Sequence, residues 1–536
     1  MKRKIYSSAF ILFLISWMAI PAQEQPVWDN TGTPGWPEFC HRVEIPSSLD
    51  GTLQPAFVSW ADTDEPRPLV VSFHTWSGTY AQTDTLAWIC HDRGYHYIHP
   101  DFRGTNDHPE ACGSPYAIRD IEDAIRFALV QANVDTARIH LTGTSGGGYA
   151  VLLAYMNTRF PVSTFSAWVP ISDLEKWYHE SVGRGSKYAG DILKCTSAGG
   201  AASGDPGPFN AAEARKRSPV YMDTPTLLRK DSKLLLYTGI HDGYTGSVPV
   251  TQTLEFYNKV VRDFDSTEES ALVPERDMLE LVASRNFVAA FKRKLAERTV
   301  HYERRYRDLA RVTVFEGMHE MLPGVALEQV ESRRILVIGD SNGAAADSWV
   351  EHLRSIRFGD RILNTSVAGN TIGFDNLGNP GLNTRRNTGR YLKMAEDSLG
   401  GVDEIIIMLG TNDCKKVFAD SLDRVPGNLR ELIREIRDTD LARRDEPDIF
   451  VVSPPPAGRD EVMLEKYHGS SNRVARLQAG FKEVARSEGC SFVDCYSTLF
   501  PNWDAYTKDG IHLVSEGQLI VAEGVAQAIS GQPIEP

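Results

Sequence analysis

Two serines lie in glycine-rich turns where a nucleophile can be presented to a carbonyl carbon. Ser145 is the centre of Gly-Thr-Ser-Gly-Gly at 143–147, and Ser341 lies in Gly-Asp-Ser-Asn at 339–342. Each turn follows an apolar segment typical of a buried strand, and a serine at such a strand end can attack when a histidine accepts its proton. Asp and His residues follow each serine further along the chain. The sequence therefore predicts two nucleophilic centres on one chain.

The first centre has candidate triad partners at the ends of later strands. Asp242 follows a predicted strand at 233–237, and His319 follows a predicted strand at 312–315. We expect His319 to accept the Ser145 proton, while Asp242 orients the imidazole and stabilises its charged form. Asp231 is a weaker alternative for the carboxylate.

A segment after the predicted strand at 69–73 is placed to complete this centre. The backbone N–H of Thr75 or Trp76 would lie beside that of Gly146, and two such donors stabilise a tetrahedral oxyanion. With the Pro-Asp-Phe-Arg-Gly stretch at 100–104, these motifs resemble the α/β-hydrolase superfamily, in its prolyl-oligopeptidase-like and carbohydrate-esterase-like branch. The resemblance covers about residues 45–325. Prolyl peptidases carry a large propeller before the hydrolase, and the short segment before the first strand here favours an esterase.

The second centre is defined by four blocks in a fixed order. They contribute Ser341, Gly369 in Ser-Val-Ala-Gly-Asn, Asn412 in Gly-Thr-Asn-Asp, and the pair Asp509 and His512 in Asp-Gly-Ile-His. This set resembles the SGNH (GDSL) hydrolases, and its sequence context resembles their arylesterase and acetylesterase branch. The resemblance implies that the backbone N–H groups of Ser341 and Gly369, with the side-chain amide of Asn412, hold the oxyanion.

Two further expectations concern the geometry of the second centre. Asp509 precedes His512 by three residues, so one helical turn would place both side chains on one face. The residue after the nucleophile is Asn342, where the family usually has Leu. We expect this change not to touch the triad.

The alternation of apolar strand and amphipathic helix patterns predicts an α/β protein with two domains. We expect an N-terminal α/β-hydrolase sheet, mostly parallel, with cap insertions, followed by a flavodoxin-like SGNH domain of three α/β/α layers. The insertion at 262–308 is expected to be helical and charged. Its cations, which include Lys292, Arg293, Arg304 and Arg305, form either a solvated helix face or a basic rim for an acidic polymer. The predicted segments are 1–22 (signal peptide), 23–325 (α/β-hydrolase domain), 326–334 (linker) and 335–536 (SGNH domain).

Residues 1–22 have the pattern of a secretory signal peptide. Lys2, Arg3 and Lys4 precede an apolar run at 9–20 that is too short to span a membrane comfortably. We expect export to the periplasm or the medium, without membrane attachment after cleavage; an uncleaved anchor is the less favoured alternative. A formal net charge of -14 argues against nucleic acid as a partner. Seven cysteines leave at least one thiol free if all bridges are internal, and a bridge between Cys112 and Cys195 is one candidate.

These patterns predict an exported carboxylic-ester hydrolase with two centres and no cofactor. His91, His96 and His99 do not complete a metal-ligand set. The expected partner is an acylated plant-type polysaccharide or oligosaccharide, from which the second centre removes acetyl groups and the first cleaves a feruloyl, methyl or acetyl ester. Three alternatives stay open: the first half is a serine peptidase of prolyl-oligopeptidase type, one half is an inactive polymer-binding module, or the acyl group passes to an alcohol.

Overall fold

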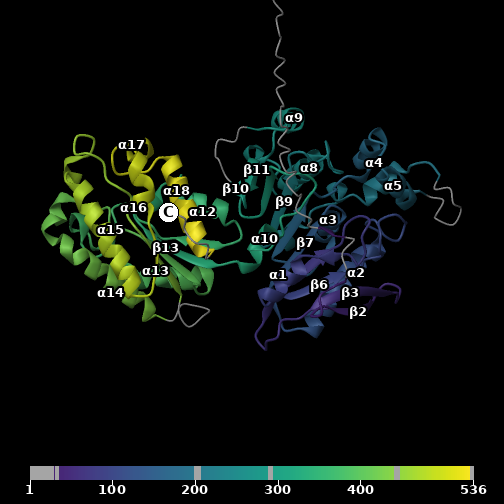
Figure 1. Cartoon of the computed structure of the whole chain (residues 1–536), viewed down its shortest axis with the longest axis horizontal. Coiled ribbons are helices and arrows are strands. Elements are labelled where there is room, and N and C mark those ends of the chain that lie inside the picture. The colour runs from purple at the N-terminus through teal and green to yellow at the C-terminus, as the bar shows by residue number, and fades with distance from the viewer. Residues whose placement is uncertain (1–28, 31–34, 198–206, 288–293, 440–446, 531–536) are drawn as a thin grey trace, which may run out of the picture.

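The computed structural model describes residues 29–30, 35–197, 207–287, 294–439 and 447–530 of the 536-residue chain. Figure 1 shows two α/β bodies side by side, one purple to teal and the other green to yellow. The predicted signal peptide lies outside the described residues. None of the helices in these ranges combines the length and hydropathy that a membrane span requires.

Within the described ranges, the first domain is built on a mixed sheet of ten strands in the order β10-β11-β12-β9-β8-β7-β4-β6-β3-β2. The run from β12 to β6 is parallel, whereas the strands at both edges pair antiparallel. The strands are β2 (His41–Pro46), β3 (Leu53–Ser59), β4 (Arg67–Phe73), β6 (His96–Pro100), β7 (Val134–Thr144), β8 (Thr164–Trp168), β9 (Lys233–Gly239), β10 (Lys294–Leu295), β11 (Arg298–Tyr306) and β12 (Ala310–Phe315). A separate short pair joins β1 (Asp29–Asn30) to β5 (Thr83–Asp84).

Helices cover both faces of this sheet, because its central strands are apolar on both sides. One face carries α2 (Pro115–Gln131), α3 (Gly146–Asn157), α8 (Val250–Phe264) and α9 (Glu275–Ser284), which share one buried cluster with the strands. The other face carries α1 (Leu86–Asp92) and α10 (Pro323–Ala326). The predicted strands at 69–73, 233–237 and 312–315 correspond to β4, β9 and β12.

The described part of the insertion at 174–230 contains four α-helices, which are α4 (Leu174–Gly183), α5 (Tyr188–Thr196), α6 (Ala211–Lys216) and α7 (Thr226–Arg229). Trp177 of α4 packs edge-on against Trp76, with 4.8 Å between ring centroids, and Tyr149 of α3 joins the same buried cluster. The insertion therefore lies over the turn that begins α3.

The sequence predicted a helical insertion at 262–308, but the structure shows a strand in its second part. After α9 the chain forms the antiparallel strand β11, on which Val300, Tyr302 and Tyr306 are buried. Arg304 and Arg305 therefore lie on a strand near the sheet edge and not on a helix, because pairing with β12 decides the conformation here. Lys292 and Arg293 fall outside the described residues.

The second domain has a sheet of five strands, all parallel, in the order β14-β13-β15-β16-β17 within the described ranges. The strands are β13 (Arg334–Gly339), β14 (Arg361–Asn364), β15 (Glu404–Met408), β16 (Asp448–Val452) and β17 (Ser491–Val493). One face packs on α13 (Thr384–Leu399), α14 (Val425–Arg437) and α15 (Ser470–Ser487), and the other on α12 (Trp349–Ile356), α16 (Cys495–Leu499) and α18 (Ser515–Ile529) (Figure 1). The remaining α-helices are α11 (Ser341–Ala344) and α17 (Trp503–Tyr506). The predicted α/β class with two domains is confirmed.

The cysteines form no bridge in the structure. All seven lie within the described residues and none is in a disulfide, so the candidate bridge between Cys112 and Cys195 is not formed. Burial raises the pKa of the Cys195 thiol, and its hydrogen bond with Cys112 acts in the same direction. The thiols of Cys112 and Cys195 therefore act as small buried groups.

The junction between the domains is packed and not extended. The predicted linker at 326–334 holds the end of α10, the short turn η4 (Glu328–Glu331) and the start of β13. Leu327 and Val330 share a buried cluster with Phe358 of the second domain. Nearby, Arg311 of β12 is 2% exposed and donates hydrogen bonds to the carbonyl of Ser355 at 3.1 Å and to the hydroxyl of Tyr237 at 2.9 Å.

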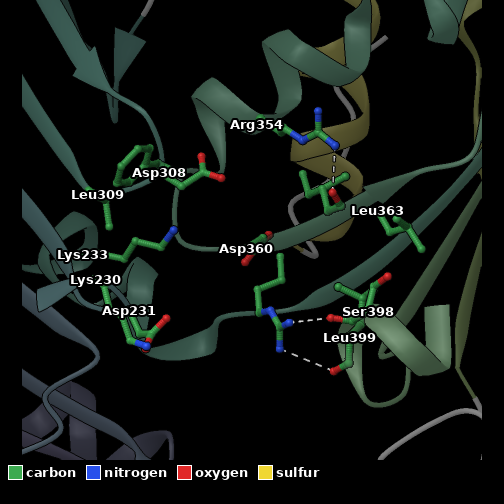
Figure 2. A pocket seen from close by; sticks show the side chains of 13 residues that line it. Lys230, Asp231, Lys233, Asp308, Leu309, Arg354, Asp360, Leu363, Ser398 and Leu399 are labelled. Carbon is green, nitrogen blue, oxygen red and sulfur yellow. Dashed lines mark hydrogen bonds and ion pairs between the residues drawn. The ribbon is translucent and has the colours of Figure 1, made fainter. Parts of the chain in front are cut away.

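A cavity of about 640 Å³ opens at the same boundary (Figure 2). Lys233 and Asp308 line it from the first domain, and Arg354 and Asp360 line it from the second. Lys233 begins β9 and Asp308 precedes β12, so the cavity lies at the amino ends of the first domain's parallel strands. Ligand sites of open parallel sheets form at the opposite, carboxyl ends.

Arg311→Met should destabilise the protein, because the hydrogen bond to Ser355 across the boundary and the one to Tyr237 within the first domain are lost while the aliphatic packing is retained. We expect the free energy of unfolding in denaturant to fall by about 2 kcal/mol, the range for hydrogen bonds from a charged donor. The control is Arg276→Met, whose side chain is 87% exposed and should change stability by less than about 0.5 kcal/mol. Equal stability of the two variants would contradict this role for Arg311.

Candidate active sites

Ser145 occupies a strained turn between β7 and α3. Its backbone angles are φ 55° and ψ -117°, a region that residues other than glycine rarely adopt. The Ser145 N–H donates to the carbonyl of Trp168 at 2.9 Å, which ties the turn to the end of β8. Such a conformation presents the hydroxyl above the carboxyl end of the sheet.

Glycines around Ser145 allow backbone segments to approach closely. A Cβ at Gly147 would lie 2.3 Å from the carbonyl oxygen of Phe73, and one at Gly143 would lie 2.5 Å from the carbonyl carbon of Gly147. Real Cβ atoms do not tolerate such distances. The turn therefore needs glycine at both positions for steric reasons.

The structure brings Asp242 and His319 together, as the triad prediction requires. Nδ1 of His319 lies 2.8 Å from Oδ2 of the fully buried Asp242, whose Oδ1 accepts the N–H groups of Gly243 and Val248 at 2.9 and 3.0 Å. These hydrogen bonds hold the Asp242 carboxylate as an acceptor of the Nδ1 proton of His319. Nε2 of His319 is then left to serve as the base. In the described part of the chain no hydrogen bond joins Ser145 to His319, and such bonds often tighten only when substrate binds. Asp231, the alternative carboxylate, is exposed, and its side chain lies 3.9 Å from the ammonium group of Lys230.

Two backbone N–H groups lie side by side near Ser145. A Cβ at Gly146 would lie 2.2 Å from the backbone nitrogen of Trp76, which shows how near these two peptides are. The Thr75 N–H is already donated to Oε1 of Gln82 at 3.0 Å. Of the two predicted alternatives, Trp76 is thus the residue whose N–H has no partner among the described residues. Gln82 holds this loop, and sequence reasoning had not singled it out.

The second centre has a complete hydrogen-bonded chain from serine to carboxylate. Nε2 of His512 lies 3.0 Å from Oγ of Ser341, and Nδ1 lies 2.7 Å from Oδ2 of Asp509. Burial acts to raise the pKa of Asp509, but hydrogen bonds from the backbone and imidazole of His512 bring that pKa below its ordinary value. Asp509 is therefore ionised where it must stabilise a charged imidazole.

The expected helical turn between Asp509 and His512 is not present. Both lie in a bend, in which Oδ1 of Asp509 accepts the N–H groups of Ile511 at 3.0 Å and His512 at 2.8 Å. An aspartate that binds the backbone two and three residues later forms a turn of its own, which replaces the helix.

The side chain of Asn342 bonds the backbone on both sides of the catalytic histidine and not a triad side chain. Its Oδ1 accepts the N–H of Leu513 at 3.0 Å, and its Nδ2 lies 3.5 Å from the carbonyl oxygen of Ile511. These two residues flank His512 on both sides. Asn342 is 1% exposed, so these bonds are shielded from water and position the histidine relative to Ser341.

The predicted oxyanion residues come from two neighbouring loops. Gly369, at φ 92°, accepts at its carbonyl oxygen a hydrogen bond from Nδ2 of Asn376 at 2.6 Å. Nδ2 of Asn412 donates to the carbonyl of Asn370 at 3.1 Å, and its Oδ1 accepts from the hydroxyl of Tyr467 at 3.2 Å. The Tyr467 bond sets which face of the amide carries its N–H groups. Neither Asn376 nor Tyr467 lies in a motif that sequence could have used.

Two buried carboxyl groups lie behind Ser341. Asp340 accepts the N–H of Asn342 at 3.0 Å, and Asp413 accepts the N–H of Ile372 at 3.0 and 3.1 Å. Burial raises the pKa of Asp340 to about 6 and that of Asp413 to about 7. Their hydrogen bonds hold the loops that carry Ser341 and Asn412.

A groove of about 590 Å³ lies at the domain boundary. It is lined by residues that include His301 of β11 and Asp347, which lies in the loop after α11. Nε2 of His301 lies 2.7 Å from Oε2 of Glu316, in the loop that leads to His319. The triad residues of the two centres are not among the residues that line this groove.

Metal ions in proteins are held by sets of side chains, chiefly those of His, Cys, Asp and Glu. No group of three or more His, Cys, Asp or Glu side chains in the described ranges is arranged to hold a metal. His96 instead bonds the backbone of Ala61 and Asn133. Burial lowers the pKa of His99 to about 3, which keeps that imidazole neutral.

A serine, a histidine and a carboxylate at the carboxyl edge of a parallel sheet define the class of α/β serine hydrolases. Residues 81–272 match the model of the prolyl oligopeptidase family, and residues 337–520 match that of the GDSL-like lipase/acylhydrolase family. The chain thus joins an α/β-hydrolase region of the prolyl oligopeptidase family to a GDSL/SGNH esterase domain. The second match contains the whole second centre, whereas His319 lies beyond the first match.

Solved structures resemble each half of the chain. A carbohydrate acetylesterase from Sinorhizobium meliloti is 22% identical over 37% of this chain and 98% of its own, with a TM-score of 0.31. An aryl esterase from M. smegmatis is 21% identical over 38% of this chain and 100% of its own, with a TM-score of 0.32. An acylaminoacyl peptidase from Pyrococcus horikoshii is 20% identical over 42% of this chain and 35% of its own, with a TM-score of 0.33. A comparison with curated proteins found no match.

Gly147→Ala should disable the first centre while the second stays active. The added Cβ meets the carbonyl oxygen of Phe73, and overpacking of this kind costs about 1–3 kcal/mol and displaces the turn that carries Ser145. The matched control is Gly190→Ala in α5, where nothing lies within 4 Å of the added carbon. That control should keep both activities and gain up to about 1 kcal/mol. Normal turnover by the Gly147 variant, measured in a Ser341→Ala background, would refute the argument.

Asp413 should make the second domain less stable as pH rises from about 4 to about 7. The folded state holds the pKa of this carboxyl at about 7, above its ordinary value of 3.8, so stability present at low pH is lost as the group ionises. Asp413→Asn should flatten this slope in unfolding measured at several pH values. Exposed Asp420→Asn is the control, and a slope unchanged by Asp413→Asn would contradict the assignment.

Proposed function

We propose that the chain is an exported carboxylic-ester hydrolase whose two domains deacylate one acylated polysaccharide or its oligosaccharides. The main support is the hydrogen-bonded triad of the second centre. Oγ of Ser341 lies 3.0 Å from Nε2 of His512, and Nδ1 of His512 lies 2.7 Å from Oδ2 of Asp509. The paired Asp242 and His319 beside the Ser145 turn support a second centre in the first domain. Export is inferred from the basic and apolar pattern of residues 1–22.

The reaction at the second centre follows from its residues. Oγ of Ser341 attacks the acyl carbon while His512 takes the hydroxyl proton, and the oxyanion is held by Gly369 and Asn412. The ester C–O bond then breaks, and His512 returns the proton to the leaving sugar oxygen. Water attacks the acyl-enzyme with His512 again as base, which releases the acid and restores Ser341.

The substrate class is inferred from the pairing of two ester-hydrolase centres on one chain. A polymer that is bound by one domain meets the nucleophile of the other at high effective concentration. We assign acetyl esters to the second domain and a feruloyl, methyl or acetyl ester to the first. The name of the solved carbohydrate acetylesterase is compatible with this assignment.

A second candidate for the first domain is a serine peptidase. It is favoured by the match of residues 81–272 to the prolyl oligopeptidase family. Under this alternative the first centre would cleave aminoacyl-arylamides, and that activity would disappear in Ser145→Ala.

The test measures acids released from acetylated xylan, acetylated and methylated pectin, and feruloylated oligosaccharides. Wild type is compared with Ser145→Ala and Ser341→Ala, and each variant should lose a different product by at least about 10³-fold, since the nucleophile is removed. A variant that matches wild type on every ester would exclude its domain from ester hydrolysis. Cleavage of aminoacyl-arylamides that depends on Ser145 would then establish the peptidase.

A further inference from the structure

Lys415 is a buried cation beside the second centre. It is 5% exposed, and among the described residues no carboxylate lies within 4.0 Å of its ammonium group. Its neighbour Lys416 shows the ordinary behaviour of a lysine, since it is exposed and pairs with Glu465 at 3.2 Å. Burying an ammonium group without an ion pair is costly, so its location calls for a compensating role.

Lys415 lies three residues after Asn412, and its ammonium group contacts the loop that carries Gly369 and the ring of Tyr467 in the short turn η8 (Glu465–Tyr467). Nζ donates to Oδ1 of Asn376 at 3.3 Å, and the same amide donates from Nδ2 to the carbonyl of Gly369 at 2.6 Å. Nζ also lies 5.5 Å from the ring centroid of Tyr467, whose hydroxyl bonds Oδ1 of Asn412. One cation thereby contacts the two side chains that orient Gly369 and Asn412.

We propose that Lys415 is a positioning residue of the second centre, which fastens the Gly369 and Asn412 loops together and supplies positive potential to the oxyanion hole. This inference rests on the proposed ester hydrolysis at Ser341. A buried charge acts through a low local dielectric, so its effect on a developing oxyanion is larger than that of an exposed lysine. The group need not touch substrate, because it acts through Asn376 and Tyr467.

The surroundings of Lys415 give this role a pH signature. Burial lowers the pKa of Lys415, and the nearby cation Lys466 lowers it further, while the carboxyl groups of Asp340 and Asp413 act to raise it. Loss of the Lys415 proton at alkaline pH would remove the positive potential. The wild-type turnover should therefore decline at alkaline pH, although the histidine base is then fully neutral.

The experiment uses the full chain with Ser145→Ala, so that only the second centre turns over 4-nitrophenyl acetate. Lys415→Met should lower kcat about tenfold with KM nearly unchanged. This loss is smaller than the loss of about 100-fold or more that follows deletion of an oxyanion donor. Lys415→Arg should restore much of kcat and remove the alkaline decline, because its guanidinium does not lose a proton. Lys416→Met is the matched control and should match the parent.

Tyr467→Phe gives an independent readout if Lys415→Met does not fold, as judged by thermal unfolding. It keeps the ring beside Lys415 but removes the bond to Asn412, and should lower kcat with KM unchanged. The proposal is overturned if Lys415→Met keeps the parental kcat and alkaline limb, or if Lys415→Arg loses as much as Lys415→Met. Where Lys415→Met does not fold, parental kcat in Tyr467→Phe overturns it. Activity that survives Ser341→Ala would instead refute the proposed function of this domain.

Discussion

Parallel strand pairing is the constraint on which both candidate centres depend. In a parallel sheet the carboxyl ends of successive strands meet at one edge, so side chains far apart in sequence become neighbours. In the first domain β12, β9, β8 and β7 follow one another across the sheet, and the loops after β7, β9 and β12 carry Ser145, Asp242 and His319. In the second domain β13 lies between β14 and β15, and the loops after these strands carry Ser341, Gly369 and Asn412.

Buried polar side chains refine what the strands bring together. Gln82 takes up the Thr75 N–H, Tyr467 orients the Asn412 amide, and Asn342 bonds the backbone on both sides of His512. Each such bond is formed away from water, where an alternative orientation would leave a polar group without a partner. The catalytic groups are therefore held by a layer of side chains that take no part in the chemistry themselves.

The two domains are joined by contacts that relate their centres in space. The buried guanidinium of Arg311 reaches Ser355 across the boundary, and Phe358 enters the cluster beneath the first sheet. The cavity of Figure 2 lies at the amino ends of the first domain's strands, and a second groove at the same boundary lies along β11 and α12.

The sequence by itself determined the α/β class, the central strands and the groups that could form each triad. These follow from short-range rules: buried strands are apolar, tight turns need glycine, and motif order along a chain survives folding. Tertiary structure alone decided the role of Asn342 and the burial of Lys415. Each depends on a partner distant in sequence, which is Leu513 for Asn342 and Asn376 for Lys415, and no local pattern encodes which distant groups will meet. The bend at Asp509 and the hairpin of β11 and β12 are local, and sequence reasoning missed them because a helical pattern was expected at both places.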